Sequence, residues 1–319
     1  MNRPHPQALP VARIAEIQPQ PLTQSWLIRS FWARAGVGMI GGAPKCCKSW
    51  LGLDMALSVA SGTPCLDRFT VDAPGPALIY LAEDTASSVR HRLDALAGHR
   101  GLDLAQLDLF AITSPVLRLD LARDQQALQR TLQRFRPRLL LLDPLVRLHR
   151  LDENSAADIS GLLGFLRELQ RRFECAVVLV HHASKKQRSQ PGQALRGSSD
   201  LHAFGDSNAY LARHKDRITL TLEHRSAKPP DPFDVSLVTA ENGAIHLAVT
   251  QSVPDLPGVP LGDRVLAFLR QTATPQTRTA IRQALRINNQ HLGDTLEALK
   301  AQGRLVRYAK GWHNAHSPP

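Results

Sequence analysis

Residues 41–50 constrain this chain more than any other segment, because their sequence is Gly-Gly-Ala-Pro-Lys-Cys-Cys-Lys-Ser-Trp. The segment fits the phosphate-binding pattern G-x-x-x-x-G-K-[ST], except that Cys47 stands where the last glycine belongs. An apolar run at 37–40 predicts a buried strand before it, and apolar residues at helical spacing between Leu51 and Val59 predict a helix after it. Strand, loop and helix in this order surround a polyphosphate with backbone N–H groups and the positive end of a helix.

The motif predicts roles for individual residues of the loop. Lys48 is expected to reach the β- and γ-phosphates of ATP, and the Ser49 hydroxyl is expected to bind Mg²⁺. The residues expected to contact the nucleotide are Gly42, Ala43, Pro44, Lys45, Cys46, Cys47, Lys48, Ser49 and Trp50. A chance cluster of glycine, lysine and serine in a loop is the alternative, and the flanking strand and helix disfavour it.

Cys47 leaves three interpretations open. Glycine at this position tolerates a positive φ, which costs any other residue about 1 kcal/mol or more. Cysteine is small, so the simplest interpretation is a tolerated substitution with modest strain. The loop could also bind nucleotide without hydrolysing it. Finally, a helix N-terminus can lower the pKa of a thiol, in which case oxidation of Cys47 would disable the loop.

Charge and composition indicate a class of partner and a compartment. The net charge of +11 and the pI near 10.1 favour an anionic partner such as nucleic acid, although charge alone is not specific. The four cysteines have no paired metal spacing and are typical of reduced thiols. The sequence starts with no apolar signal core and has no run of 18 apolar residues, so we expect a soluble cytoplasmic protein without a membrane partner.

Apolar runs alternate with amphipathic stretches through the middle of the chain. This alternation predicts an α/β fold with a mostly parallel sheet that helices cover on both faces. Two later strands, with a turn at Asn242-Gly243, are of hairpin type. The expected strands are 37–40, 77–82, 107–112, 138–142, 175–180, 217–224 and 233–247, and the expected helices are 87–99, 125–135 and 159–173. The domains expected are an N-terminal arm at 1–22, the α/β domain at 23–250, a linker at 251–260 and a small domain at 261–319.

The last domain has its own pattern. Helices are expected at 261–271, 277–285 and 288–302, followed by a hairpin of 305–308 and 311–313. This order is that of a winged helix, with the third helix as the recognition helix. Basic residues outnumber acidic ones, which favours DNA contact, while protein contact or simple packing remains the alternative. The residues expected to contact DNA here are Arg286, Asn289, Lys300 and Arg307.

Two acidic positions follow predicted strands. Asp143 follows four leucines in the Walker B arrangement and is expected to hold Mg²⁺ together with Ser49, unless it merely starts a turn before Pro144. Glu83 ends the strand 77–82, and the carboxyl ends of parallel strands form the ligand-binding edge of a sheet. We therefore expect Glu83 to be the general base for the attacking water, with an exposed acidic pair, Glu83-Asp84, as the alternative.

His181 and His182 follow the strand 175–180 in the same way, and an imidazole there can hydrogen-bond the γ-phosphate. A metal site is the alternative, but no neighbouring cysteine or carboxylate in the sequence completes one. The next segment, 184–199, is basic, polar and glycine-bearing, so it is expected to contact a DNA backbone, unless it is only a solvated loop. The residues expected to make that contact are Lys185, Lys186, Arg188 and Arg196.

Together these segments resemble the RecA-like ATPases of the RepA type, which include hexameric replicative helicases of plasmids. The resemblance covers about residues 26–247. It rests on the phosphate loop, on Tyr-Leu-Ala-Glu-Asp at 80–84, on Leu-Asp-Pro at 142–144, on Val-His-His-Ala-Ser-Lys at 180–185 and on Leu-Arg-Gly-Ser-Ser at 195–199. The loop is common to many families, whereas the ordered set is more specific.

The resemblance implies that Lys48 and Ser49 bind nucleotide and Mg²⁺ and that Asp143 completes the Mg²⁺ site. It also implies that Glu83 activates water and that His182 senses the γ-phosphate. Such proteins form rings in which a neighbouring subunit supplies a basic residue. The segment Glu-His-Arg-Ser-Ala-Lys at 223–228 occupies the corresponding place, so Arg225 or Lys228 is the implied residue.

The leading hypothesis is an ATP-driven motor on single-stranded DNA, a hexameric helicase or translocase of plasmid or mobile-element replication. The first alternative is an ATP-switched regulator or loader without unwinding activity, whose C-terminal domain selects duplex origin DNA. A degraded ATPase kept as a scaffold follows only if Cys47 abolishes nucleotide binding.

Overall fold

A computed structural model describes residues 11–18, 25–153, 155–182, 199–214, 217–240, 243–250, 261–270, 272, 274–285, 289–308 and 311–315. The chain divides into two compact units, Met1–Val249 and Thr250–Pro319. Within the described ranges, no helix has the length and apolar character needed to cross a membrane.

A nine-stranded sheet organises the first unit, in the order β11-β10-β9-β8-β3-β7-β6-β4-β5. The strands from β5 to β8 pair in parallel, and β9 and β10 extend the sheet in antiparallel fashion. The bounds are β3 (Val37–Gly42), β4 (Ala77–Leu81), β5 (Leu109–Ala111), β6 (Leu139–Asp143), β7 (Ala176–His182), β8 (Ser207–His214), β9 (Arg217–His224), β10 (Phe233–Thr239) and β11 (Ile245–Thr250). The predicted α/β fold with a mostly parallel sheet is confirmed.

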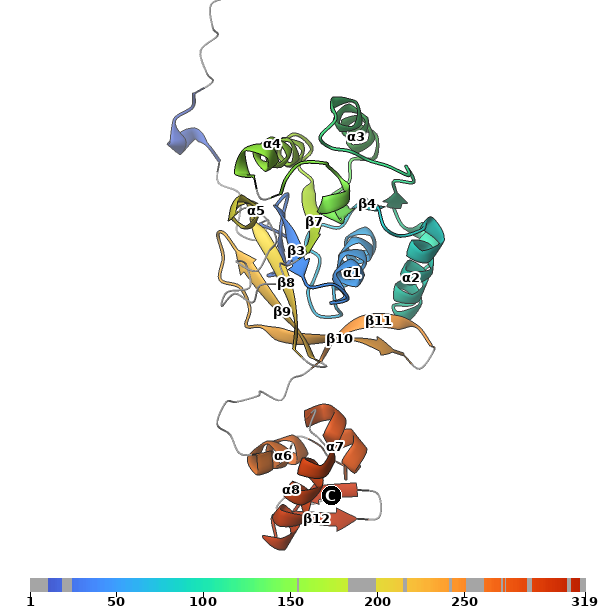
Figure 1. Cartoon of the computed structure of the whole chain (residues 1–319), viewed down its shortest axis with the longest axis vertical. Helices are drawn as coiled ribbons and strands as arrows, with labels where there is room; N and C mark the ends of the chain where they lie inside the picture. The colour runs from blue at the N-terminus through green and yellow to red at the C-terminus, as the bar shows by residue number, and fades with distance from the viewer. Residues whose placement is uncertain are drawn as a thin grey trace, which may run out of the picture. The chain divides into compact units, whose positions relative to one another are not determined.

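Helices cover both faces of this sheet (Figure 1). The helices α1 (Lys48–Ser61) and α2 (Ala86–His99) lie on one face, and α3 (Ala122–Phe135) and α4 (Ala156–Phe173) lie on the other. Alternate residues of one strand therefore enter different cores: Leu141 packs with α1 and α2, whereas Leu140 packs with α3 and α4. Burial on both faces explains why these strands are continuous apolar runs.

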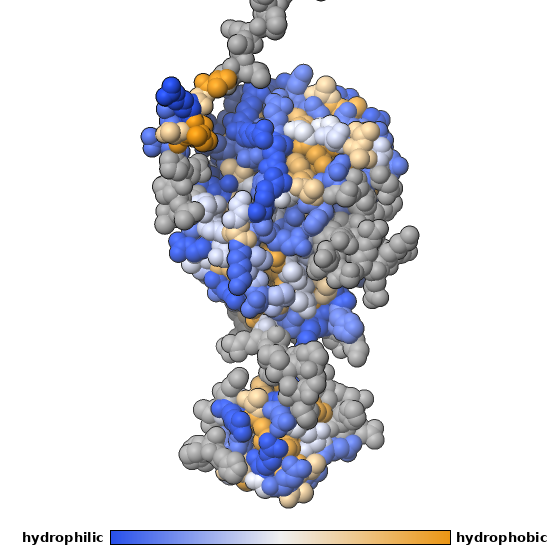
Figure 2. Space-filling view, turned by 90° about the vertical axis from the view of Figure 1, so that its left-hand side faces the viewer, coloured by the Kyte–Doolittle hydropathy of each residue, from blue (hydrophilic) through white to orange (hydrophobic). Residues whose placement is uncertain are grey.

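Smaller elements complete the first unit. They are η1 (Ile14–Glu16), β1 (Trp26–Ile28), β2 (Trp32–Ala33), η3 (Leu104–Gln106), η4 (Leu145–Arg147) and α5 (Ser199–Phe204). The antiparallel pair β1–β2 is a separate two-stranded sheet. Figure 2 shows one face of the molecule, where hydrophilic residues dominate and hydrophobic residues form small patches.

The structure differs from the sequence-based expectations in two places that matter for the site. The strand expected to end at Val180 continues to His182, because β7 keeps pairing with β3 as far as Gly42 opposite His182. The two histidines therefore belong to the strand instead of following it. The strand β8 was not predicted, because its central Ala209–Ala212 run is short and its ends are polar.

The second unit contains α6 (Leu261–Arg270), α7 (Arg278–Leu285), α8 (Asn289–Ala301), β12 (Leu305–Tyr308) and β13 (Gly311–Asn314). The two strands form an antiparallel hairpin, and the unit has its own apolar core, which includes Leu266, Leu296 and Trp312. This is the order of elements expected from the sequence. The winged-helix assignment stays a prediction.

Gly38 allows β3 to pack in the middle of the sheet. A Cβ at this position would lie 1.6 Å from the carbonyl oxygen of Ser207, which is backbone of β8 and cannot move alone. We expect Gly38→Ala to lower the free energy of unfolding by about 3 kcal/mol or more, because the added methyl forces the strands apart. Chemical denaturation measures this difference.

The matched control is Gly161→Ala on the exposed face of α4, where an added Cβ meets nothing within 4 Å. Alanine favours a helix interior, so this variant should be more stable than the natural chain by about 0.5–1 kcal/mol. Equal effects of the two substitutions would contradict the packing argument.

Candidate nucleotide-binding site

The carboxyl ends of four parallel strands meet at one edge of the sheet. Gly42 at the end of β3 pairs with His182 at the end of β7, and Leu81 at the end of β4 pairs with Asp143 at the end of β6. The loop from 43 to 47 leaves β3 at this edge and leads into α1. The structure thus brings the predicted loop, Glu83, Asp143 and His182 to the same edge, as expected for a parallel sheet.

The loop is compact and its last residue is strained. Lys45 and Cys47 have positive φ angles of 62° and 63°. Cys47 is the residue that caps the N-terminus of α1, yet its side chain makes no capping hydrogen bond. The first N–H groups of a helix have no partner within the helix, so this terminus is suited to an anion.

Lys48 is held across its own loop. Its Nζ donates a hydrogen bond to the carbonyl oxygen of Ala43 at 2.8 Å, and the side chain is buried. Burial lowers the pKa of Lys48, and the nearby Cys46, Asp143 and Glu83 oppose that shift. Of the other loop residues, Ala43, Pro44 and Lys45 are exposed, Cys46 is buried, and Cys47, Ser49 and Trp50 are partly buried.

Asp143 forms the opposite wall of the site. Burial raises the pKa of its carboxyl to about 6, although a hydrogen bond with the Ser49 side chain lowers it and the charge of Lys48 acts in the same direction as that bond. Its Oδ2 atom is buried and has no hydrogen-bond partner among the described residues. A buried carboxylate oxygen without a partner, next to a hydroxyl, is a donor set that fits a hard divalent cation such as Mg²⁺.

Asp143 gives a prediction about stability and pH. Its native pKa of about 6 lies above the ordinary value of 3.8, so the native state loses stability as pH rises from 3.8 to 6. Without nucleotide at pH 7.5, Asp143→Asn should therefore unfold at higher denaturant concentration, by up to about 3 kcal/mol. The advantage should shrink as pH falls below 6.

The control for this measurement is Asp94→Asn, which removes an exposed carboxylate that is paired only with Arg90 on α2. An exposed pair contributes about 0.5 kcal/mol or less, so this variant should show no gain at pH 7.5. An Asp143→Asn protein that is less stable than the natural chain at both pH 7.5 and pH 5 would contradict the burial argument.

Glu83 lies at the rim of the site. It is largely exposed, and its Oε1 atom accepts a hydrogen bond from Nε of Arg147 at 2.7 Å. Arg147 belongs to η4, which follows Asp143 almost directly. The sequence analysis missed Arg147, and its position four residues after Asp143 is a signal that could have identified it.

The two histidines at the end of β7 point to opposite faces of the sheet, as consecutive strand residues do. His182 is partly buried on the loop side, where burial and then the charge of Lys48 lower its pKa, so it is neutral at pH 7. On the other side, Nδ1 of His181 lies 3.8 Å from Oε1 of buried Glu153, and Nε2 of His149 lies 3.6 Å from the same oxygen.

This arrangement corrects the expectation that no carboxylate lies near the histidine pair. Glu153 is close to His181 in space, although 28 residues separate them in the sequence. Because His181 and His182 face apart, they do not form one metal site together.

An arginine from the unpredicted strand reaches the loop. Nη2 of Arg213 on β8 donates a hydrogen bond to the carbonyl oxygen of Lys45 at 2.7 Å. Its positive charge also lowers the pKa of Cys47, but burial has the larger effect, and the pKa of this thiol is raised overall. The expectation of a lowered pKa at Cys47 was therefore wrong, because the loss of water outweighs the nearby positive charges.

The positive φ of Cys47 leads to a stability prediction. A left-handed conformation costs a residue with a side chain about 1–2 kcal/mol relative to glycine. We therefore expect Cys47→Gly to be more stable than Cys47→Ala by about 1 kcal/mol in denaturant unfolding. At Cys46, which is not among the positive-φ residues, the alanine variant should be the more stable one. The same order at both positions would contradict this prediction.

Arg225 does not join the site of its own chain. It follows β9, which runs antiparallel to β8, and its N–H group donates to the carbonyl oxygen of Asp206 at 2.9 Å. Asp206 in turn donates its N–H to Val37 at the beginning of β3. Arg225 therefore lies at the amino edge of the sheet, opposite the phosphate loop. The exposed Lys228 lies in the loop that follows.

Most of the residues expected to bind DNA cannot be placed. Lys300 lies 3.8 Å from Glu297 in a surface ion pair, and the guanidinium of Arg307 lies 5.5 Å from the ring centre of Trp312. The structure does not describe the side chain of Asn289. The residues that lie outside the described ranges are Lys185, Lys186, Arg188, Arg196 and Arg286.

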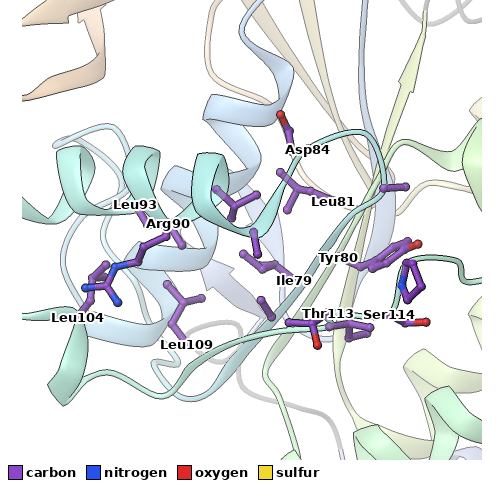
Figure 3. A pocket seen from close by; sticks show the side chains of 16 residues that line it. Ile79, Tyr80, Leu81, Asp84, Arg90, Leu93, Leu104, Leu109, Thr113 and Ser114 are labelled. Atoms are coloured by element: carbon purple, nitrogen blue, oxygen red, sulfur yellow. The ribbon is translucent and has the colours of Figure 1, made fainter.

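An apolar pocket of about 290 Å³ lies beside the site, between β4, β5 and α2. Figure 3 shows its lining, in which Ile79, Leu93 and Leu109 contribute apolar surface and Asp84 is at the end near the strand terminus. None of the residues expected to contact ATP lines it. The pocket is thus distinct from the phosphate loop.

Fold and site together define a P-loop ATPase with a RecA-like core. Residues 3–188 match the family model described as an AAA domain (AAA_25), which spans more than half of the chain. The protein belongs to this AAA domain family.

Among solved structures, the ATPase domain of a helicase has a TM-score of 0.52 and 15% sequence identity, covering 67% of this chain and 84% of that chain. The RadB recombinase has a TM-score of 0.49 and 17% identity, covering 67% of this chain and 91% of that chain. At such identities, the match to the helicase ATPase domain shows a shared fold.

Proposed function

We propose that the protein is an ATP-hydrolysing motor that moves along single-stranded DNA, a ring-forming helicase or translocase of the RepA type in plasmid or mobile-element replication. The observation that carries the proposal is the buried, unpartnered Oδ2 of Asp143 beside Ser49 and Lys48, at the mouth of a phosphate-binding loop. A site of this kind favours a bound cation and polyphosphate, because both would compensate charges that burial now disfavours.

The chain's own residues have distinct tasks in this proposal. Lys48 would exchange the Ala43 carbonyl for a phosphate oxygen, and the N–H groups at the start of α1 would bind the same phosphates. Ser49 and Asp143 would hold Mg²⁺. When bound, Mg²⁺ neutralises charge that develops on the phosphates during transfer.

Glu83 would orient and deprotonate the attacking water. Its present partner, Arg147, must release it first, because a carboxylate engaged by a guanidinium is a poor base. His182, which is neutral and partly buried, would hydrogen-bond the terminal phosphate and transmit its loss along β7.

The position of Arg225 supports a homo-oligomer. Since this residue lies at the amino edge, it cannot reach the nucleotide of its own chain, and neither can Lys228 in the loop that follows. A basic residue supplied by a neighbouring copy would stabilise charge in the transition state, which can be worth about 10³-fold or more in rate. We infer a ring, and a hexamer by resemblance to the RepA type.

Single-stranded DNA would be held by the basic segment 184–199, through Lys185, Lys186, Arg188 and Arg196. The second unit would contact duplex origin DNA as a winged helix, through Arg286, Asn289, Lys300 and Arg307.

A second candidate function is an ATP-switched DNA-binding regulator or loader. It is favoured by the separate core of the second unit and by the strained Cys47 in the phosphate loop. In this case nucleotide binding alone changes the assembly state, and the second unit selects the DNA site.

The deciding experiment is steady-state ATP hydrolysis by the full chain, with and without single-stranded DNA. For a motor, we expect DNA to raise turnover and Lys48→Ala to lower it by about 100-fold or more, because a charged phosphate ligand is lost. Lys45→Ala is the matched control, since this exposed lysine lies in the same loop and should matter far less.

The remaining outcomes separate the two functions. Nucleotide binding without turnover in the natural chain, with turnover restored in Cys47→Gly, would identify a switch. Turnover indifferent to single-stranded DNA, together with sequence-specific duplex binding, would also favour the regulator. If the natural chain neither binds nor hydrolyses ATP, both proposals fail.

A further inference from the structure

Three side chains from distant parts of the chain meet away from the phosphate loop. Asp67 lies in the turn between Cys65 and Phe69 after α1, His99 is the last residue of α2, and His246 is in β11. One nitrogen or oxygen atom from each of them lies within 4.8 Å of those of the other two. The ATPase proposal uses none of these residues.

The contacts between them are close. Nε2 of His99 lies 2.8 Å from Oδ2 of Asp67, and the rings of His99 and His246 stack with centroids 3.4 Å apart and planes 9° apart. Face-to-face stacking is not the arrangement that aromatic rings prefer. The stack therefore does not by itself explain why two imidazoles are held together here.

His246 carries an unsatisfied polar atom. Its side chain belongs to a residue that is only 8% exposed, and Nδ1 is buried without a hydrogen-bond partner among the described residues. Burial, followed by the neighbouring His99, lowers the pKa of His246, while Asp67 and the carbonyl of Ala244 oppose this shift. The ring is thus neutral at pH 7, which is the form that binds metals.

The surrounding charges leave Asp67 available for a cation. The nearest positive group is Arg100, whose Nε lies 3.6 Å from Oδ1 of Asp67. The same guanidinium donates through Nη2 to the buried carboxylate of Asp54 at 2.6 Å. Because Asp54 neutralises Arg100, the carboxylate of Asp67 adds a net negative charge beside the two histidines.

We propose that Asp67, His99 and His246 bind a divalent transition-metal ion of the Zn²⁺ class, with the fourth position open to water. Two imidazoles and one carboxylate suit Zn²⁺, Co²⁺ or Ni²⁺, whereas Mg²⁺ prefers oxygen ligands. Binding requires the partly exposed His99 ring to turn out of the stack about χ2, a torsion with broad preferences.

The ion would connect parts of the fold that are remote in sequence. It joins β11, at the far end of the antiparallel extension, to the C-terminal ends of α1 and α2, which begin at the nucleotide-binding edge. Its role is structural, and it does not depend on the proposed ATPase function.

The test is a titration of the metal-free full chain with Co²⁺ and Zn²⁺, followed by the visible absorption of bound Co²⁺ and by thermal unfolding. We expect one equivalent of Co²⁺ with a tetrahedral spectrum, displaced by Zn²⁺ and not by Mg²⁺. Asp67→Asn and His99→Gln should weaken Zn²⁺ binding by about 100-fold or more, since even partners of metal ligands contribute about 10–100-fold.

Controls separate this site from the other histidines and from the ATPase site. His91→Gln changes an exposed histidine on the same helix α2 and should bind Zn²⁺ like the natural chain. Lys48→Ala should also bind Zn²⁺ normally, because the phosphate loop is not involved. His246→Ala should lose binding, and the two less buried variants test the site if this one does not fold.

The proposal is overturned if Asp67→Asn and His99→Gln bind Zn²⁺ as tightly as His91→Gln. It is equally overturned if the natural chain binds no stoichiometric Co²⁺, or if Zn²⁺ leaves its thermal unfolding unchanged.

Discussion

The parallel pairing of β3 with β7 and β8 is the constraint on which the rest of this structure depends. Gly38 lets the backbones of β3 and β8 approach closely, since a Cβ there would meet the Ser207 carbonyl. Buried side chains strengthen the junction: Asn208 accepts a hydrogen bond from the N–H of Met39, and Asp206 accepts one from Val37. This pairing places the end of β3 beside His182 and therefore fixes where the phosphate loop begins.

Burial at that edge acts on opposite charges in opposite directions. It lowers the pKa of Lys48 and raises that of Asp143 to about 6, so each group is less easily charged than it would be in water. The two remain near each other, with Ser49 hydrogen-bonded to the carboxylate. A site that holds incompletely compensated charges is prepared for a ligand that carries both signs, such as a phosphate with its cation.

Much of the core could be predicted from the sequence, because strands buried on both faces must be apolar throughout, as in the leucines of β6. The site was predicted only where a residue adjoins such a strand or the loop, as with Lys48 and Asp143. The strand β8 lacks a long apolar run, so Arg213 was missed. Glu153 was missed because a contact with His181 across 28 residues has no local pattern.

The sequence by itself determined the phosphate loop, the α/β class and the order of the elements, since these follow from local spacing and from the period of apolar residues. Only the tertiary structure decided which polar groups share an edge and which do not. It separated His181 from His182 across the sheet, placed Arg225 at the opposite edge, and brought Asp67, His99 and His246 together. These relations depend on strand register and on chain crossings, through which residues distant in sequence become neighbours.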